Sequence, residues 1–326
     1  MKNKFSKILP QILFTLLVYT LLVILWGAWV RISQSGDGCG DTWPLCRGQL
    51  IPDAAQKKTW VEFAHRGMSG FFGIFVFSLF IFIRKNFARD SRTYTWIKWS
   101  LIFTVTEALL GAKLVLFHLV GNNDTPFRAF AMALHLINSL MLTASVAMTW
   151  DVTNNQNSVA RVQNPWGKQQ AYRPLQIKKI FISLIASFLA LGVTGAIAAL
   201  ANTIYPALSL NEGLLADLNE NSHYLIRLRA FHPMMGILIG CGLTLSLWIS
   251  SQFTKDDEII FKRRTLRAAA GCLFGVVIGA TTLLTLSPPT MKLVHLTMTY
   301  TIWILLTLWC RQLLWPIESV PAEKNK

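Results

Sequence analysis

The segment VEFAHRGMSGFFGIFVFSLFIFI, which runs from Val61 to Ile83, decides the fold of this chain. It is apolar over most of its length, and a helix needs about 20 such residues to cross the roughly 30 Å hydrocarbon core of a bilayer. Seven further stretches have the same character, at residues 11–31, 97–118, 128–150, 180–201, 230–250, 267–287 and 292–314. The sequence therefore predicts an all-α, polytopic membrane protein with eight transmembrane helices.

Composition and charge agree with this fold class. Of the 326 residues, 53% are hydrophobic and 14% are charged, whereas soluble domains carry about 25% charged residues. The net charge is +15, and most of the 31 lysines and arginines fall in the loops and tails on one side of the predicted helices. Because cytoplasmic loops carry such an excess, we expect a cell-membrane protein, in contact with the lipid bilayer, with both termini cytoplasmic. Topology explains the positive charge, so nucleic acid is not an expected partner.

The two halves of the chain repeat one another. A Gly-Ala dipeptide and a histidine recur at a near-constant offset, which relates Gly27 to Gly195, Gly111 to Gly279, His65 to His232 and His135 to His295. A unit of four helices crosses the membrane an even number of times, so both copies share one orientation. We expect an N-terminal four-helix bundle over residues 1–150, a cytoplasmic linker over 151–179 and a C-terminal four-helix bundle over 180–326.

The recurring histidines predict haem ligands. One polar histidine on an apolar helix is more often a hydrogen-bonded core residue, but ionisable groups in the bilayer are costly and usually mark function. Here each half has two, on its second and fourth helices, and facing helices of a bundle commonly hold a cofactor between them. Two imidazoles on opposite sides of a plane suit haem iron, whereas zinc takes three or four ligands. We therefore expect His65, His135, His232 and His295 to be axial ligands of haem iron.

Basic and acidic residues flank these histidines. Arg31, Arg66 and Arg229 lie near the same helix ends and could bind haem propionates, because guanidinium pairs well with carboxylate; contact with lipid headgroups is the alternative. Glu62 precedes His65 by one helical turn, where the second half has Arg229, so an acid/base group is expected at one site alone. Glu62 could instead orient His65. The role of Glu107 stays open between a proton carrier, a ligand-facing group and an ion-pair partner.

The cysteines fall into two classes. Cys39 and Cys46 lie in the loop after the first helix, and we expect a disulfide between them; a redox-active pair and a metal site are the alternatives. Cys241, Cys272 and Cys310 lie in apolar segments and are expected to be small core residues. His118 and His223 have no counterparts in the repeat and are expected to be surface residues.

At these residues the chain resembles the haem A synthase family over nearly its whole length. The resemblance is most specific at GAWVRISQSGDGCGDTWPLCRG (residues 27–48) and at EFAHR (residues 62–66). It implies that the N-terminal bundle binds the substrate, haem O, through His65 and His135 with Glu62 as a catalytic group. The C-terminal bundle would hold haem b as cofactor through His232 and His295. Cys39 and Cys46 match the family's disulfide pair, but residues 202–229 lack the second cysteine pair of some members.

The implied reaction is oxidation of a porphyrin methyl group of haem O to a formyl group by successive hydroxylations, for haem-copper terminal oxidases. Haem O synthase and cytochrome oxidase assembly proteins are the implied partners, and the electron acceptor and oligomeric state are not readable from the sequence. Histidine pairs alone would equally suit a two-haem b-type cytochrome that transfers electrons, or a haem transporter or chaperone.

Overall fold

The computed structural model of the protein describes residues 2–53, 56–154, 174–254 and 259–314, and the regular structure in these ranges is helical. Within them, eight helical spans are long and apolar enough to cross a membrane, so the chain is an all-α, multi-pass membrane protein, as predicted. The long helices are α1 (Lys2–Ile32), α2 (Lys57–Asn86), α3 (Arg92–Leu116), α4 (Pro126–Asn154), α5 (Pro174–Ile204), α8 (Phe231–Gln252), α9 (Ile259–Leu284) and α10 (Pro289–Leu314).

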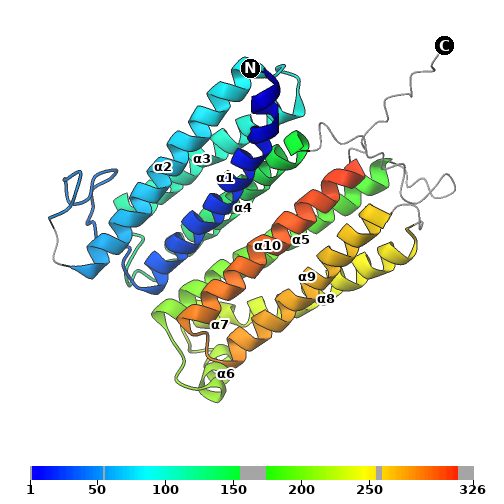
Figure 1. Cartoon of the computed structure of the whole chain (residues 1–326). Helices are drawn as coiled ribbons and strands as arrows, with labels where there is room; N and C mark the ends of the chain where they lie inside the picture. Colours follow the sequence, from blue (N-terminus) through cyan, green and yellow to red (C-terminus); the bar gives the residue numbers. More distant parts are fainter. Residues whose placement is uncertain (1, 54–55, 155–173, 255–258, 315–326) are drawn as a thin grey trace, which may run out of the picture.

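These long helices fall into two sets, which lie side by side in Figure 1. In the first set, α1 to α4 pack in order and α4 returns to contact α1. In the second set, α5, α8, α9 and α10 pack in order and α10 contacts α5. Helix α4 joins the sets because it packs against both α5 and α10. The predicted linker lies mostly at residues 155–173, outside the described residues.

Two short helices cover one end of the second set, α6 (Leu210–Leu218) and α7 (Tyr224–Arg229). These helices lie between the apolar stretches at residues 180–201 and 230–250 and were not predicted, although the sequence holds a signal for α6. Ser209 accepts a hydrogen bond from the Glu212 backbone N–H, at the serine-to-glutamate spacing of a helix capping box. We call this end of the molecule, where α6 and the α1–α2 and α3–α4 loops lie, the disulfide end.

The two cores are packed, not merely apolar. Leu13, Leu16 and Val76 are buried in the first set. Phe188 stacks on Trp303 in the second, with ring centroids 5.1 Å apart. Lipid chains are as apolar as leucine, so helices associate in a membrane through close packing and hydrogen bonds. The sets therefore need specific contacts to stay together.

Such contacts are present along the α4–α10 boundary. Trp303 Nε1 donates to the Leu140 carbonyl at 2.7 Å, and the hydroxyls of Ser139 and Tyr300 are 2.5 Å apart. Near the C-terminal ends of the same two helices, the buried side chains of Asp151 and Arg311 form an ion pair. Breaking a buried pair by removing one partner typically costs 3–5 kcal/mol. This boundary therefore fixes how the two sets meet.

The cysteines divide almost as expected. A disulfide joins Cys39 and Cys46, whose Cα atoms are 4.5 Å apart, and both residues are buried. Cys272 and Cys310 are buried in the core of the second set, as predicted. The prediction for Cys241 was wrong, because its side chain is exposed on the outer surface of α8. An apolar neighbourhood in the sequence does not distinguish a core position from one that faces lipid.

Candidate functional site

The four repeated histidines lie close to the disulfide end, each near the start of its own helix: His65 on α2, His135 on α4, His232 on α8 and His295 on α10. The rings of His232 and His295 have centroids 6.1 Å apart and an interplanar angle of 73°. His65 and His135 lie on α2 and α4 of the first set. The structure therefore places two of these histidines in each set, and the two of the second set lie close together.

The spacing of the second pair fits a metal between two imidazoles. With metal–nitrogen bonds of about 2 Å on each side, the ring centroids would be separated by roughly 6 Å. Within the described residues, no group of three or more histidine, cysteine or acidic side chains could hold a metal ion. A metal that brings its other ligands with it, as porphyrin iron does, needs only the two axial positions.

Each of these imidazoles lies against a glycine of a neighbouring helix. A Cβ atom added to Gly195 would lie 2.9 Å from His232 Cε1, and one added to Gly27 would lie 2.9 Å from His65 Cε1. Gly279 and Gly111 face His295 and His135 in the same way, with Cβ–Cε1 separations of 3.1 and 3.9 Å. The repeated Gly-Ala dipeptides are therefore the surfaces on which the histidine rings rest.

The Nδ1 atoms of the histidines have different surroundings. His232 Nδ1 is 3.2 Å from the Thr194 hydroxyl. The Nδ1 atoms of His65 and His295 are buried and have no hydrogen-bond partner within the described residues. Leaving a buried polar atom unpaired costs about 1–3 kcal/mol. Rings placed at such a cost fit a ligand-binding role better than a purely structural one.

The fourth histidine, His135, faces a carboxylate. Glu107 Oε1 on α3 lies 3.4 Å from His135 Nδ1, within ion-pair reach although not aligned as a hydrogen bond. The other Glu107 oxygen accepts from Asn138 Nδ2 at 2.5 Å, and Thr106 Oγ1 donates to Asn138 Oδ1 at 2.6 Å. Of the roles left open for Glu107, these contacts match the ion-pair partner, with His135 as the other member of the pair.

Glu62 has a different partner from the one its spacing suggests. Its carboxylate accepts from the Cys39 backbone N–H at 2.8 Å and from Arg66 Nη2 at 2.6 Å. Arg66 Nη1 in turn donates to the carbonyls of Thr42 and Leu45. Glu62 is buried. These bonds hold the loop between α1 and α2, which carries the Cys39–Cys46 disulfide and is called the disulfide loop below, against the start of α2. The sequence could not show this, because the loop lies more than twenty residues earlier in the chain.

The three arginines expected near the haem sites differ in their partners. Arg66 is paired as described above, and Arg229 is bonded to Asp217 at 2.6 Å and to Asn202 at 3.0 Å. Arg31 instead lies within electrostatic range of two further cations, Arg128 and Lys292. Arg128 itself donates to the carbonyls of Gly121 and Asn123. The Nε atom of Arg31 is buried and without a hydrogen-bond partner among the described residues. The sequence analysis missed Arg128 and Lys292, since they come from separate helices.

The remaining histidines are peripheral. The His118 side chain is 68% exposed and lies 3.2 Å from Asp41, as expected of a surface residue. His223 caps the start of α7 and lies 3.5 Å from Asp124.

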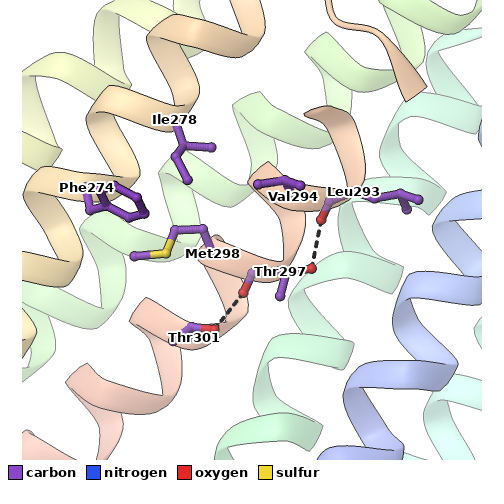
Figure 2. A pocket seen from close by; sticks show the side chains of 7 residues that line it. All are labelled: Phe274, Ile278, Leu293, Val294, Thr297, Met298 and Thr301. Atoms are coloured by element: carbon purple, nitrogen blue, oxygen red, sulfur yellow. Dashed lines mark hydrogen bonds between the residues drawn. The ribbon is translucent and has the colours of Figure 1, made fainter. Parts of the chain in front are cut away.

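An apolar groove of about 330 Å³ lies between α9 and α10, and Figure 2 shows the side chains that line it. Phe274 and Ile278 come from α9, and Leu293, Val294, Thr297, Met298 and Thr301 come from α10. The two threonine hydroxyls donate to carbonyls of their own helix, so they are satisfied without a ligand. The groove thus presents apolar surface on α10, the helix that carries His295.

Comparison with known proteins gives a family match over most of the chain. The profile of the COX15-CtaA family, described as cytochrome oxidase assembly protein, matches residues 10–307. A Thermus thermophilus protein named protoheme IX farnesyltransferase is 32% identical over 292 residues, which are 89% of this chain and 46% of that protein. A protein named heme A synthase from Symbiobacterium thermophilum is 34% identical over 154 residues, 47% of each chain.

A second protein named heme A synthase, from Shouchella clausii, is 37% identical over 128 residues, which are 39% of this chain and 40% of that relative. The matched part of this chain spans about half the length, or less, of these curated relatives.

Proposed function

The chain belongs to the COX15-CtaA family of cytochrome oxidase assembly proteins, and from this premise we propose that it is a haem A synthase. Its reaction would be oxidation of one methyl group of haem O to a formyl group. The observation that carries the proposal is the pairing of four histidines, two in each set of helices, in a chain similar to proteins named heme A synthase.

We assign the substrate to the first set of helices and the cofactor to the second. His65 and His135 would ligate haem O, and His232 and His295 would ligate haem b. Haem b, when bound, would supply one-electron redox chemistry at its iron. The glycines of α1, α3, α5 and α9 have no side chain, so each imidazole can approach the backbone of its neighbouring helix closely.

The cations between the sets are the best candidates for holding haem propionates. Arg31, Arg128 and Lys292 come from α1, α4 and α10, and the repulsion of Arg31 by each of the other two would be relieved by a carboxylate. Arg66 and Arg229 already satisfy carboxylates of the protein, Glu62 and Asp217. We therefore propose that Arg31 binds a propionate directly, whereas Arg66 and Arg229 position the segments that cover the two sites.

Glu62 would serve the substrate site from the side of the disulfide loop. By holding Cys39 and Arg66, it keeps the loop over the start of α2, close to His65 in the sequence. Such a cover would exclude water from the bound substrate and limit its movement. The proposal also includes proton transfer by the same carboxylate.

The proposal also includes location and partners. The distribution of basic residues supports cytoplasmic termini, with the disulfide end on the opposite side of the cell membrane. The match of this chain to 46% of a protein named protoheme IX farnesyltransferase supports a haem O synthase as a working partner. Such an enzyme makes the substrate that this chain would use. Co-purification of the two from membranes would test the partnership.

Product analysis tests the proposed activity. The chain would be expressed in a host that makes haem O but no haem A, and extracted haems would be identified by mass spectrometry. We expect a product with a formyl group in place of one methyl group. A His65→Ala, His135→Ala variant is the matched control. Haem bound by the intact chain with haem O unchanged would refute the synthase and favour an electron-carrying cytochrome or a haem carrier.

A further inference from the structure

We propose that Glu107 is a positioning residue for the first set: it fixes the ring of His135 and makes the haem bound there more electron-rich than the haem of the second set. The inference rests on the proposed function, because it assumes that His135 is an axial ligand. Glu107 lies on α3. It is not part of the repeated pattern, and the histidine pairs do not depend on it.

The carboxylate of Glu107 lies close to the imidazole of His135. Glu107 Oε1 lies 3.4 Å from His135 Nδ1, so a small rotation of either side chain would complete a hydrogen bond. A histidine that ligates a metal usually donates its other N–H to a carboxylate, carbonyl or water, which fixes the ring and raises its basicity. A more basic axial ligand stabilises the oxidised iron and thereby lowers the reduction potential.

Glu107 is itself held in place by hydrogen bonds. Asn138 lies one helical turn after His135 on α4, and its Nδ2 donates both to Glu107 Oε2 at 2.5 Å and to the Phe103 carbonyl at 2.9 Å. The Thr106 hydroxyl donates a hydrogen bond to the amide oxygen of Asn138. A carboxylate in an apolar segment is costly unless its partners are supplied. Because the chain supplies such partners for Glu107, we infer that the carboxylate has a specific role at this position.

The second set lacks the residues that form this network. By the offsets that relate Gly111 to Gly279 and His135 to His295, the counterparts of Thr106, Glu107 and Asn138 are Phe274, Gly275 and Met298. Phe274 and Met298 line the apolar groove of Figure 2. The Nδ1 atom of His295 has no hydrogen-bond partner in the described part of the chain. One histidine of the same repeat position thus faces a carboxylate, and the other does not.

The test uses the full chain loaded with iron protoporphyrin. The signal of the first site is the part of the haem absorbance that a His135→Ala substitution removes. Glu107→Gln should weaken haem binding at this site by about 10- to 100-fold and make its reduction potential more positive. The haem of the second site should keep its affinity and potential. Lys113→Gln is the matched control, because it removes an exposed charge from the same helix.

Asn138→Met provides a second variant that introduces the residue of the second set and leaves the carboxylate in place. It should shift the first-site potential in the same direction by a smaller amount, and it should add nothing to Glu107→Gln in the double variant. Loss of the second-site haem would show that Glu107→Gln does not fold. In that case the change in the first-site reduction potential of Asn138→Met decides whether the inference holds.

Two results would overturn the inference, and they can be told apart. Unchanged affinity and potential at the first site in both variants would remove the positioning role while leaving His135 as a ligand. If His135→Ala removed no haem signal, the ligand assignment under the proposed function would fail, and the role of Glu107 would fail with it.

Discussion

The two sets of helices carry the same histidine pair and the same glycine contacts, yet they differ in the groups around the pair. In the first set, Glu107 faces His135, and Glu62 ties a disulfide loop to the start of α2. In the second, Gly275 and Met298 stand where Glu107 and Asn138 stand in the first, and Arg229 occupies the place of Glu62 and bonds to Asp217 on α6. A repeated scaffold can thus hold two similar ligands in chemically unequal surroundings.

The largest expected effect comes from replacing the histidines, and it differs between the two sets of helices. Replacing His232 with Ala should abolish the haem b spectrum and haem A formation together, because the cofactor is then lost. Replacing His65 with Ala should also abolish haem A formation but leave the haem b spectrum intact. Absorbance spectra of the purified variants and haem analysis of the host give both readings. Loss of the haem b spectrum in His65→Ala would show that the two sets do not work as separate sites.

The next effect concerns Glu62. Glu62→Gln keeps the size of the side chain but weakens its bonds to Cys39 and Arg66. If Glu62 transfers a proton, the rate should fall about 100- to 10,000-fold; if it positions the loop and the ligand, the fall should be about 10- to 100-fold. The contacts favour the smaller range.

The control for Glu62 is a variant that loosens the same loop without touching the carboxylate. Thr59→Val removes the hydrogen bond from the Thr59 hydroxyl to the Gly38 carbonyl. A similar rate loss in both variants would support a loop-holding role, and a much larger loss in Glu62→Gln would support proton transfer. A normal rate in Glu62→Gln would contradict both.

A smaller effect is expected from the glycine surfaces. Gly195→Ala places a Cβ 2.9 Å from His232 Cε1, so the ring must move away from its present position. We expect roughly tenfold weaker haem b binding, at the low end of the range for disturbed ligand orientation, measured by haem titration. Gly242→Ala on α8 is the control, because its Cβ would meet no atom within 4 Å. Equal affinities in the two variants would show that the close approach is not needed.

The smallest effect lies at the disulfide end, where the sets touch outside the membrane spans. The Tyr205 hydroxyl donates to Asp124 Oδ2 at 2.5 Å, and this bond holds the pKa of the Asp124 carboxyl below its usual range. A carboxyl with a lowered pKa stabilises the fold above its unfolded pKa of about 4, and that contribution disappears as the pH falls through its folded pKa.

Asp124→Asn should therefore lower the melting temperature slightly at pH 7, and the difference from the parent chain should vanish in strong acid. Melting curves between pH 7 and pH 3 check this, with Asp41→Asn as a control at another exposed carboxyl. A difference that persists unchanged at pH 3 would exclude the titration of Asp124 as its cause.

Sequence patterns were most informative where one local property sufficed. A helix must be about 20 apolar residues long to cross a bilayer, so the eight spans could be read directly. The Gly-Ala and histidine repeat predicted which positions correspond in the two halves. The i,i+3 spacing of Glu62 and His65 was equally visible, but it predicted a shared helix face and could not reveal the loop that Glu62 contacts.

The sequence by itself determined the fold class, the membrane spans, the four histidines and the cysteine pair. Only the tertiary structure decided that Glu107 faces His135, that Arg66 and Arg229 are already paired, and that Arg31 lies within electrostatic range of Arg128 and Lys292. The physical reason is that a membrane helix is apolar on nearly all of its faces, since it contacts either lipid or other helices. Its apolar pattern therefore does not fix its rotation, and the facing residues are set by packing between distant segments.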